Sequence, residues 1–319
     1  MHAVTAATLV LPLLVPVPLT HVDGKAGHGM FEAPPDQVWL HQTRDTVHRS
    51  THWVVRSVDG WFGEEPFEDS GGEVGGSVSV HGVYREDDGF NARGRFRLDV
   101  TMPNVDERVY LFLGRDDEEE VVRDRPDRVT RAEQRRAEDE REAALFAGIG
   151  YYLRENTELR LSVRSGYKPY VQARYRKAWW LTERDRVEFR ETIFLETDDG
   201  LGSTTALDYS RALSDRRRFR WRNAGTVSTG TSGLAWSTAI GTFDDLRRQR
   251  ELALDAVARG RTGEEVTVRE YGLRASYRHP VYRDWVFGEL MLGHFWPRSE
   301  DDPERQRAWA VGLGVEMLF

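Results

Sequence analysis

The feature that most constrains this chain is an alternation of apolar and polar residues with a period of two. It is clearest between Asn91 and Met102, where the apolar set is Ala92, Gly94, Phe96, Leu98, Val100 and Met102. Arg93, Arg95, Arg97 and Asp99 belong to the intervening polar set. Because successive side chains of a β-strand point to opposite faces, this segment predicts a strand with one apolar and one charged face. A soluble sandwich and a membrane barrel both accept such a strand.

The alternation recurs along most of the chain. It predicts strands near 76–85, 91–102, 107–115, 144–154, 159–164, 171–181, 186–196, 203–213, 218–222, 233–243, 251–259, 270–278, 285–297 and 308–319. Turns rich in Pro, Asn or charge alternate with turns that hold Gly beside acids or Thr. Such regular spacing is typical of a meander that closes into a ring. We therefore predict an all-β, transmembrane, antiparallel up-and-down β-barrel of about 14 strands, with 12 as the alternative count.

Composition is compatible with a barrel that crosses a membrane. The chain has 319 residues, a formal net charge of −8 at pH 7 and a mean hydropathy of −0.60. Barrel strands need apolar side chains only at alternate positions, so a low average hydropathy is expected. The negative charge provides no basic surface for nucleic acid. The absence of cysteine excludes disulfides and thiolate metal sites, and we expect no cofactor and no bound metal.

The first 75 residues lack the alternation and divide into two segments. Residues 1–22 hold an apolar run that Pro12, Pro16 and Pro18 interrupt, which disfavours a spanning helix and fits a secretory signal peptide. No Lys or Arg precedes this run, so we expect the true signal to start further upstream. Residues 23–75 are predicted to form a periplasmic linker and one amphipathic helix. The apolar residues of that helix recur at helical spacings: Leu40, Val47, Val54, Val58 and Trp61.

The C-terminal strand is the most specific segment of the chain. It ends AVGLGVEMLF, with apolar side chains on one face and small residues on the other. This ending resembles the terminal signal of bacterial outer-membrane proteins, an alternating strand with a final aromatic residue, here Phe319. The resemblance implies recognition by the barrel assembly machinery and location in the outer membrane. An even number of strands returns the C-terminus to the side of the N-terminal helix, which we expect in the periplasm. The segments VQARYRKAWWLTERD and YRDWVFGELMLGHFWPR also resemble an uncharacterised proteobacterial envelope family, which implies fold and location only.

Three features favour the barrel over a soluble sandwich or a lipid-carrying periplasmic protein. They are the signal-like start, the terminal strand ending in Phe319, and tryptophans near the strand ends. Those tryptophans fit an interfacial girdle: Trp179, Trp180, Trp221, Trp236, Trp285, Trp296 and Trp309.

In a barrel, the charged set of each strand faces the lumen. The predicted lumen-lining residues are Arg93, Arg95, Arg97, Arg160, Arg174, Arg176, Arg218, Arg220, Arg222, Glu270 and Arg274. An arginine ladder of this kind can line an anion path, because fixed charge on a pore wall selects the opposite ion. The alternative is a self-paired ion network that fills the barrel and maintains its shape.

The segment 116–143 is almost entirely charged, with both signs interspersed. Its position along the meander predicts a long extracellular loop. The simplest interpretation is a solvated loop, and the functional alternative is binding of a partner or of lipopolysaccharide phosphates. We expect outer-membrane lipids and lipopolysaccharide as partners of the barrel.

Histidines are the remaining candidates for chemistry. His81 and His294 are candidates for a Ser–His pair with Ser77, Ser79 or Ser203 in an outer-leaflet enzyme, against the simpler interpretation of packing or hydrogen bonding. The spacing of His48 and His52 suits zinc, but no third ligand follows in a strong pattern, which favours incidental surface histidines.

The sequence predicts an outer-membrane barrel of structural or passive-channel type with an Arg-rich lumen. Two alternatives stay open. One is an outer-leaflet lipid-modifying enzyme, and the other is a partner-binding barrel that acts through loop 116–143.

Overall fold

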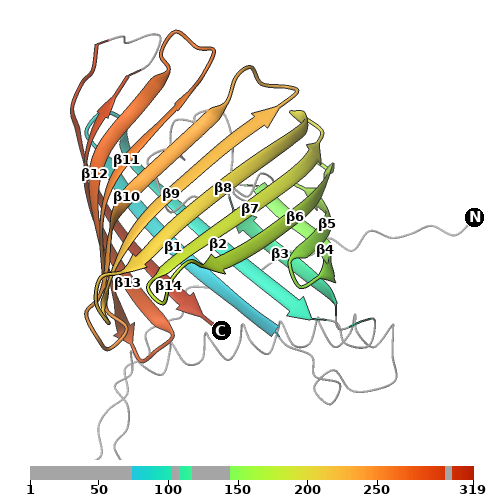
Figure 1. Ribbon diagram of the computed structural model, residues 1–319, viewed down its shortest axis with the longest axis horizontal. Coiled ribbons are helices and arrows are strands. Elements are labelled where there is room, and N and C mark those ends of the chain that lie inside the picture. Colours follow the sequence, from blue (N-terminus) through green and yellow to red (C-terminus); the bar gives the residue numbers. More distant parts are fainter. Residues whose placement is uncertain (1–73, 102–105, 107, 117–143, 299–303) are drawn as a thin grey trace, which may run out of the picture. The chain divides into compact units, whose positions relative to one another are not determined.

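The computed structural model describes residues 74–101, 106, 108–116, 144–298 and 304–319 (Figure 1). The predicted signal 1–22, the helix predicted within 23–75 and nearly all of loop 116–143 lie outside these residues. The described residues form fourteen strands: β1 (Val74–Arg85), β2 (Gly89–Thr101), β3 (Val109–Asp116), β4 (Ala144–Arg154), β5 (Thr157–Arg164), β6 (Lys168–Trp180), β7 (Asp185–Glu196), β8 (Gly200–Ala212), β9 (Arg217–Ser228), β10 (Ala235–Asp245), β11 (Glu251–Arg261), β12 (Val268–Tyr282), β13 (Val286–Pro297) and β14 (Ala308–Leu318).

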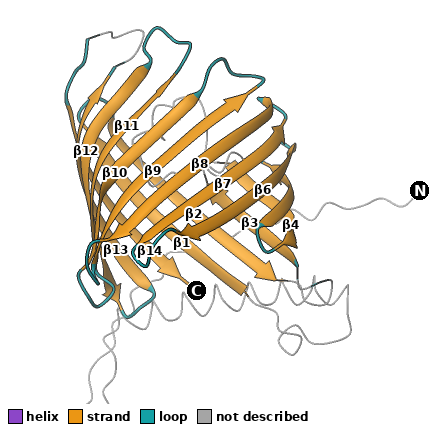
Figure 2. Cartoon of the chain, viewed as in Figure 1, coloured by secondary structure: helices purple, strands orange, loops and turns teal. Residues whose placement is uncertain are grey.

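The strands form one closed antiparallel sheet (Figure 2). Each strand pairs with its neighbours in sequence, and β1 pairs with β14 so that Val80 lies opposite Val315. At this seam the backbones of Gly76 and Phe319 exchange two hydrogen bonds of 3.0 and 3.1 Å. Closure removes the unpaired edges that promote aggregation of open sheets. The predicted closed barrel is confirmed, with fourteen strands among the described residues and not twelve.

The register places the apolar sets on the outside of the barrel. Leu161 of β5, for example, shares its face with its partners Ile149 of β4 and Val171 of β6. Leu161, Leu273 and Leu313 are 56, 57 and 65 % exposed. A wall of this kind suits lipid, where a closed ring pairs all strand backbone groups. The barrel therefore crosses a membrane with its strands, in the manner of the even-numbered barrels of bacterial outer membranes.

The two classes of turn lie at opposite ends of the barrel. The chain enters β1 and leaves β14 at the same end, since these strands are antiparallel partners. The connections at this end have two to seven residues, whereas the other end carries the long connections 117–143 and 298–307. Because barrels of this kind have short periplasmic turns and longer extracellular loops, we assign this end to the periplasm.

Inside the barrel, aromatic rings pack over glycines. Five inner-face aromatic side chains form a buried cluster on β3, β4, β6 and β7: Tyr110, Phe112, Phe146, Tyr170 and Phe194. A Cβ added at Gly150 would lie 2.1 Å from Cζ of Tyr110, and one added at Gly202 would lie 2.2 Å from Cζ of Phe194. These glycines are therefore required by close ring packing on the inner wall.

We expect Gly150→Ala to lower the free energy of unfolding by about 1–3 kcal/mol, because the new methyl group overlaps the Tyr110 ring. Denaturant unfolding of the barrel from lipid vesicles measures this change. Gly94→Ala is the matched control, since its added Cβ meets nothing within 4 Å, and it should change stability by less than about 0.5 kcal/mol. Equal losses in both variants would contradict the packing explanation.

Candidate functional site

The candidate site is the inner wall of the barrel. The register places every predicted lumen-lining residue on the strand face opposite the apolar set. These residues lie on β2 (Arg93, Arg95, Arg97), β5 (Arg160), β6 (Arg174, Arg176), β9 (Arg218, Arg220, Arg222) and β12 (Glu270, Arg274). They do not form one cluster, because the strands that carry them are spread around the ring.

A cavity of about 250 Å³ lies between the inner faces of β1 and β2 and those of β9 to β14. Its charged lining consists of six arginines and four carboxylates: Arg95, Arg97, Arg220, Arg222, Arg274, Arg278, Glu251, Asp255, Glu289 and Glu316. Ser77, Ser79 and His81 of β1 complete the polar part of the wall. The lining of this cavity therefore carries an excess of positive charge.

Asp255 links two of these arginines. Its Oδ2 accepts a hydrogen bond of 2.8 Å from Arg274, and its Oδ1 lies 3.7 Å from a guanidinium nitrogen of Arg222. The three residues come from β11, β12 and β9, and all three are buried. One carboxylate thus separates two guanidinium groups in a setting where unpaired charge is costly.

Nearer the periplasmic end, Arg278 is surrounded by partners. Its guanidinium donates a hydrogen bond of 2.8 Å to Glu316, lies 3.9 Å from the carboxylate of Glu251 and covers the Phe287 ring at 3.7 Å from the centroid. Arg278 is therefore held in place on the wall by contacts from β11, β13 and β14.

Two arginines of β9 differ from these. In the described part of the chain, Arg218 and Arg220 have no carboxylate within ion-pair distance, whereas Arg222 on the same face pairs with Asp255. Arg218 is exposed, Arg220 is partly buried and Arg222 is buried. The inner face of β9 thus leads from exposed, unpaired charge near the periplasmic end to paired charge in the interior.

The arginines of β5 and β6 belong to a separate group. Arg160 and Arg174 both approach Glu158, and Arg160 also donates a hydrogen bond of 2.7 Å to the Tyr110 hydroxyl. The Arg160 guanidinium lies 5.0 Å from the centroid of Phe112. These contacts hold the two arginines beside the aromatic cluster, and neither of them lines the cavity.

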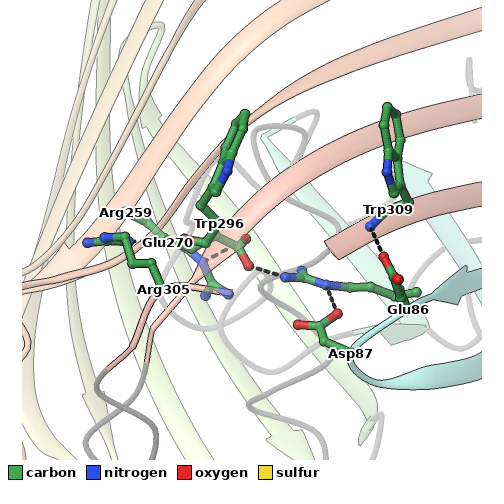
Figure 3. Close-up of polar contacts among 8 residues, drawn as sticks. Glu86, Asp87, Arg259, Glu270, Trp296, Arg305 and Trp309 are labelled. Atoms are coloured by element: carbon green, nitrogen blue, oxygen red, sulfur yellow. Dashed lines mark hydrogen bonds and ion pairs between the residues drawn. The ribbon is translucent and has the colours of Figure 1, made fainter. Parts of the chain in front are cut away.

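Glu270 occupies a closed environment at the extracellular end, shown in Figure 3. Its carboxylate accepts a hydrogen bond from Arg85 and lies 3.4 Å from Arg259, and Arg85 also donates to Asp87 at 2.6 Å. Arg85 and Glu270 are each 1 % exposed. Arg85 reaches Glu270 across β14 and β13, over the Phe295 ring that packs on Gly293. Glu270 faces inward as predicted, but its carboxylate is surrounded by packed side chains and not by an open lumen.

A further ion pair lies in the extracellular turn between β7 and β8. Asp198 accepts hydrogen bonds from Lys168, at 2.9 Å, and from Arg164, at 2.6 Å. The Lys168 hydrogen bond, assisted by the charge of Arg164, holds the pKa of Asp198 below its usual range. This turn is therefore tied to the ends of β5 and β6 at neutral pH.

The histidines do not assemble a catalytic group among the described residues. His294 faces outward between two tryptophans, at ring-centroid distances of 4.4 Å from Trp296 and 4.2 Å from Trp309. His81 faces inward, 3.6 Å from Glu289. Within the described ranges, no hydrogen bond joins either histidine to a serine and no cluster of three metal-ligand side chains occurs. His48 and His52 lie outside the described residues.

Sequence reasoning missed Arg85, Arg259 and Glu158 as members of the inner wall. Arg85 precedes an acidic turn and Arg259 follows an Ala/Val-rich stretch, so neither stands in a run of charged alternation. Extending the two-residue period of each strand to both of its ends assigns all three side chains to the inner face.

Among the described residues, no helix is both long enough and apolar enough to span a membrane. The sequence matches no protein-family model and no curated protein. The fold is similar to solved outer-membrane structures. OprB of Pseudomonas putida at high pH is 9 % identical over 79 % of this chain and 95 % of its own, with a TM-score of 0.47. A bacterial polysaccharide outer membrane secretin is 12 % identical over 77 % and 98 %, with a TM-score of 0.43.

A third structure, the KdgM porin in complex with disordered oligogalacturonate, is 7 % identical over 76 % of this chain and 99 % of its own, with a TM-score of 0.39. At these identities and TM-scores, the similarity concerns the fold alone and carries no argument about function. The resemblance to an envelope family stays a prediction.

Proposed function

We propose that this barrel is a passive channel of the outer membrane with a weak preference for anions. The observation that carries the proposal is the excess of arginine over carboxylate on the cavity wall, with Arg220 unpaired among the described residues. Fixed positive charge on a pore wall attracts anions and repels cations. A unit charge about 4 Å from an ion contributes about 4 kcal/mol at an effective dielectric constant near 20, before salt screening.

The ion pairs of the wall limit this preference. Asp255 and Glu316 neutralise part of the charge of Arg274 and Arg278, and the aromatic cluster narrows the opposite side of the lumen. A barrel with this inner wall should pass small solutes. Its selectivity for anions should be weaker than that of a pore whose wall charges are all unpaired. The competing function is a closed structural barrel whose ion network fills the lumen.

The experiment is conductance of the full chain in planar bilayers under a salt gradient. We expect discrete open steps and a reversal potential that favours the anion. Arg218→Ser with Arg220→Ser should lower the anion-to-cation permeability ratio by about two- to fivefold, since the pair provides unpaired positive charge on the wall. Arg217→Ser is the matched control, because Arg217 lies on the outer face of the same strand and pairs with Asp244 at 2.6 Å.

The control should leave the permeability ratio unchanged. A folded wild-type barrel without open steps contradicts the channel and supports the closed structural barrel. Open steps with a cation preference contradict the proposal that the arginines of the wall determine the selectivity.

A further inference from the structure

The outer wall of the barrel is not uniformly apolar. On β1, β2, β4, β11 and β14, the described outer-face side chains are apolar or aromatic, or the position is glycine. On β7 to β10, charged pairs such as Arg217 with Asp244 lie on the outer face toward the periplasmic end, and polar side chains also interrupt the apolar surface nearer the middle of the strands. We call this set the polar wall: Glu191, Ser203, Thr205, Asn223 and Thr238. It covers four adjacent strands, so it is a continuous patch on one side of the ring.

Glu191 is the most unusual member of the polar wall. It lies near the middle of β7, on the same outer face as Ile193 and Leu195, which are both more than half exposed. Its carboxylate accepts hydrogen bonds from the hydroxyls of Ser203 and Thr205, the latter at 2.7 Å. In the described part of the chain, no cation lies within ion-pair distance of it. A carboxylate offers about four acceptor sites, so two hydroxyls leave it incompletely satisfied in hydrocarbon.

Asn223 forms the second polar centre of this wall. Its Oδ1 accepts a hydrogen bond of 2.8 Å from Thr238, which in turn accepts one of 3.1 Å from the Trp221 indole. Its Nδ2 donates only a long bond of 3.4 Å to the Leu207 carbonyl oxygen. The second amide hydrogen has no acceptor among the described residues, at a depth where lipid offers none.

We propose that the polar wall is the contact surface for a second copy of this chain within the membrane. Two copies inserted by the same route share one orientation and one depth, so a twofold axis along the membrane normal brings the same wall together. Hydroxyl and amide groups both donate and accept, which makes this patch able to bond to itself. Polar side chains of this kind stabilise contacts between membrane segments where water is absent.

Charge complementarity supports a second copy as the occupant. Lys177 lies on the outer face of β6, next to the polar wall, where it pairs in register with Phe189 while Tyr175 pairs with Glu191. Lys177 and Glu191 are therefore diagonal neighbours that do not bond within one barrel. In a twofold contact whose axis passes between β6 and β7, Lys177 of one copy supplies the cation that Glu191 of the other lacks. This inference is independent of the proposed conductance, because the outer wall does not line the lumen.

Single cysteines test the proposal directly, because the chain contains none. The variants Thr205→Cys, Asn223→Cys and Thr238→Cys probe the polar wall, and Leu161→Cys and Leu313→Cys probe apolar walls. Each full-length variant is folded into phosphatidylcholine vesicles at low protein-to-lipid ratio, treated with a short bis-maleimide and run on a denaturing gel. We expect a dimer band from at least one polar-wall variant and none from the other two. No band from any variant, or equal bands from both sets, overturns the proposal.

Mass in detergent provides the second measurement. The wild-type barrel should sediment as a dimer, and Glu191→Leu should sediment as a folded monomer, while Glu191→Gln should keep part of the dimer because its amide oxygen still accepts hydrogen bonds. A wild-type monomer that retains added lipopolysaccharide, with the retention lost in Glu191→Leu, assigns the polar wall to a lipid and overturns the second copy. If Glu191→Leu does not fold, the cysteine variants still decide the question.

Discussion

Glu270→Ala is expected to lower the free energy of unfolding by about 3–5 kcal/mol, because it removes the buried carboxylate that the buried guanidinium groups of Arg85 and Arg259 share. Arg85 and Glu270 are each 1 % exposed, and Arg85 also covers the Phe295 ring at 5.0 Å from the centroid. The contact joins β1 to β12 across the seam at which the barrel closes. Denaturant unfolding from lipid vesicles, followed by tryptophan fluorescence, measures the loss.

Two further variants separate the buried pair from a general effect of charge. Glu264→Ala removes a carboxylate whose partner Arg269 is half exposed, and it should cost at most about 1 kcal/mol. The triple variant Arg85→Met, Arg259→Met and Glu270→Met should recover most of the stability that Glu270→Ala loses, because both guanidinium groups that share the Glu270 carboxylate are then removed with it. A loss in Glu270→Ala no larger than that in Glu264→Ala would contradict this account.

The fold was predictable because a barrel strand displays its two environments in a two-residue period. The alternation from Ala92 to Met102 and from Trp309 to Phe319 identified the membrane-facing residues without knowledge of any partner strand. The glycine-containing turns then set the order of the strands. Closure between β1 and β14 followed from the need to pair every strand backbone in lipid.

The inner wall was predictable only as a set of charges. The sequence indicated that Arg218, Arg220 and Arg222 share a face, but it contained no signal that only Arg222 reaches Asp255. In register, Gly241 of β10 lies opposite both Asp255 and Arg220, yet it is Arg222 that comes within 3.7 Å of Asp255, so the pairing depends on side-chain conformation and not on register. The contact between Arg85 and Glu270 was equally hidden, since it spans two intervening strands and 185 positions of sequence.

The polar wall had a visible signal that strand counting overlooked. In DRVEFRETIFLE, Glu191 occupies the same alternating set as Val187, Phe189 and Ile193. One charged residue in the apolar set weakens the alternation, and for that reason the segment 186–196 predicts a strand less clearly than its neighbours do. In the structure, the neighbouring strands β8, β9 and β10 also carry polar residues on their outer faces. Glu191 is therefore part of a polar surface and not an isolated irregularity of one strand.

Asp255→Asn is expected to raise the anion preference of the channel and to lower the stability of the barrel together. The substitution removes the carboxylate that holds Arg274 at 2.8 Å and Arg222 at 3.7 Å. The two guanidinium groups then face each other across a neutral amide, which adds a net positive charge to the cavity wall. Because breaking a buried pair by removing one partner is strongly destabilising, we expect a loss of about 3 kcal/mol or more. Reversal potentials and denaturant unfolding measure the two effects.

Glu251→Gln is the matched control, because it changes the charge of the same cavity by the same amount. Arg278 keeps its hydrogen bond to Glu316, so the stability of this variant should fall by at most about 1 kcal/mol. The anion preference should rise in both variants, since it depends on the sum of wall charges. If the anion preference rises in neither variant while open steps are retained, the permeating ion does not pass this cavity. A rise in Asp255→Asn alone would instead make the freed guanidinium groups, and not the total charge, the determinant of selectivity.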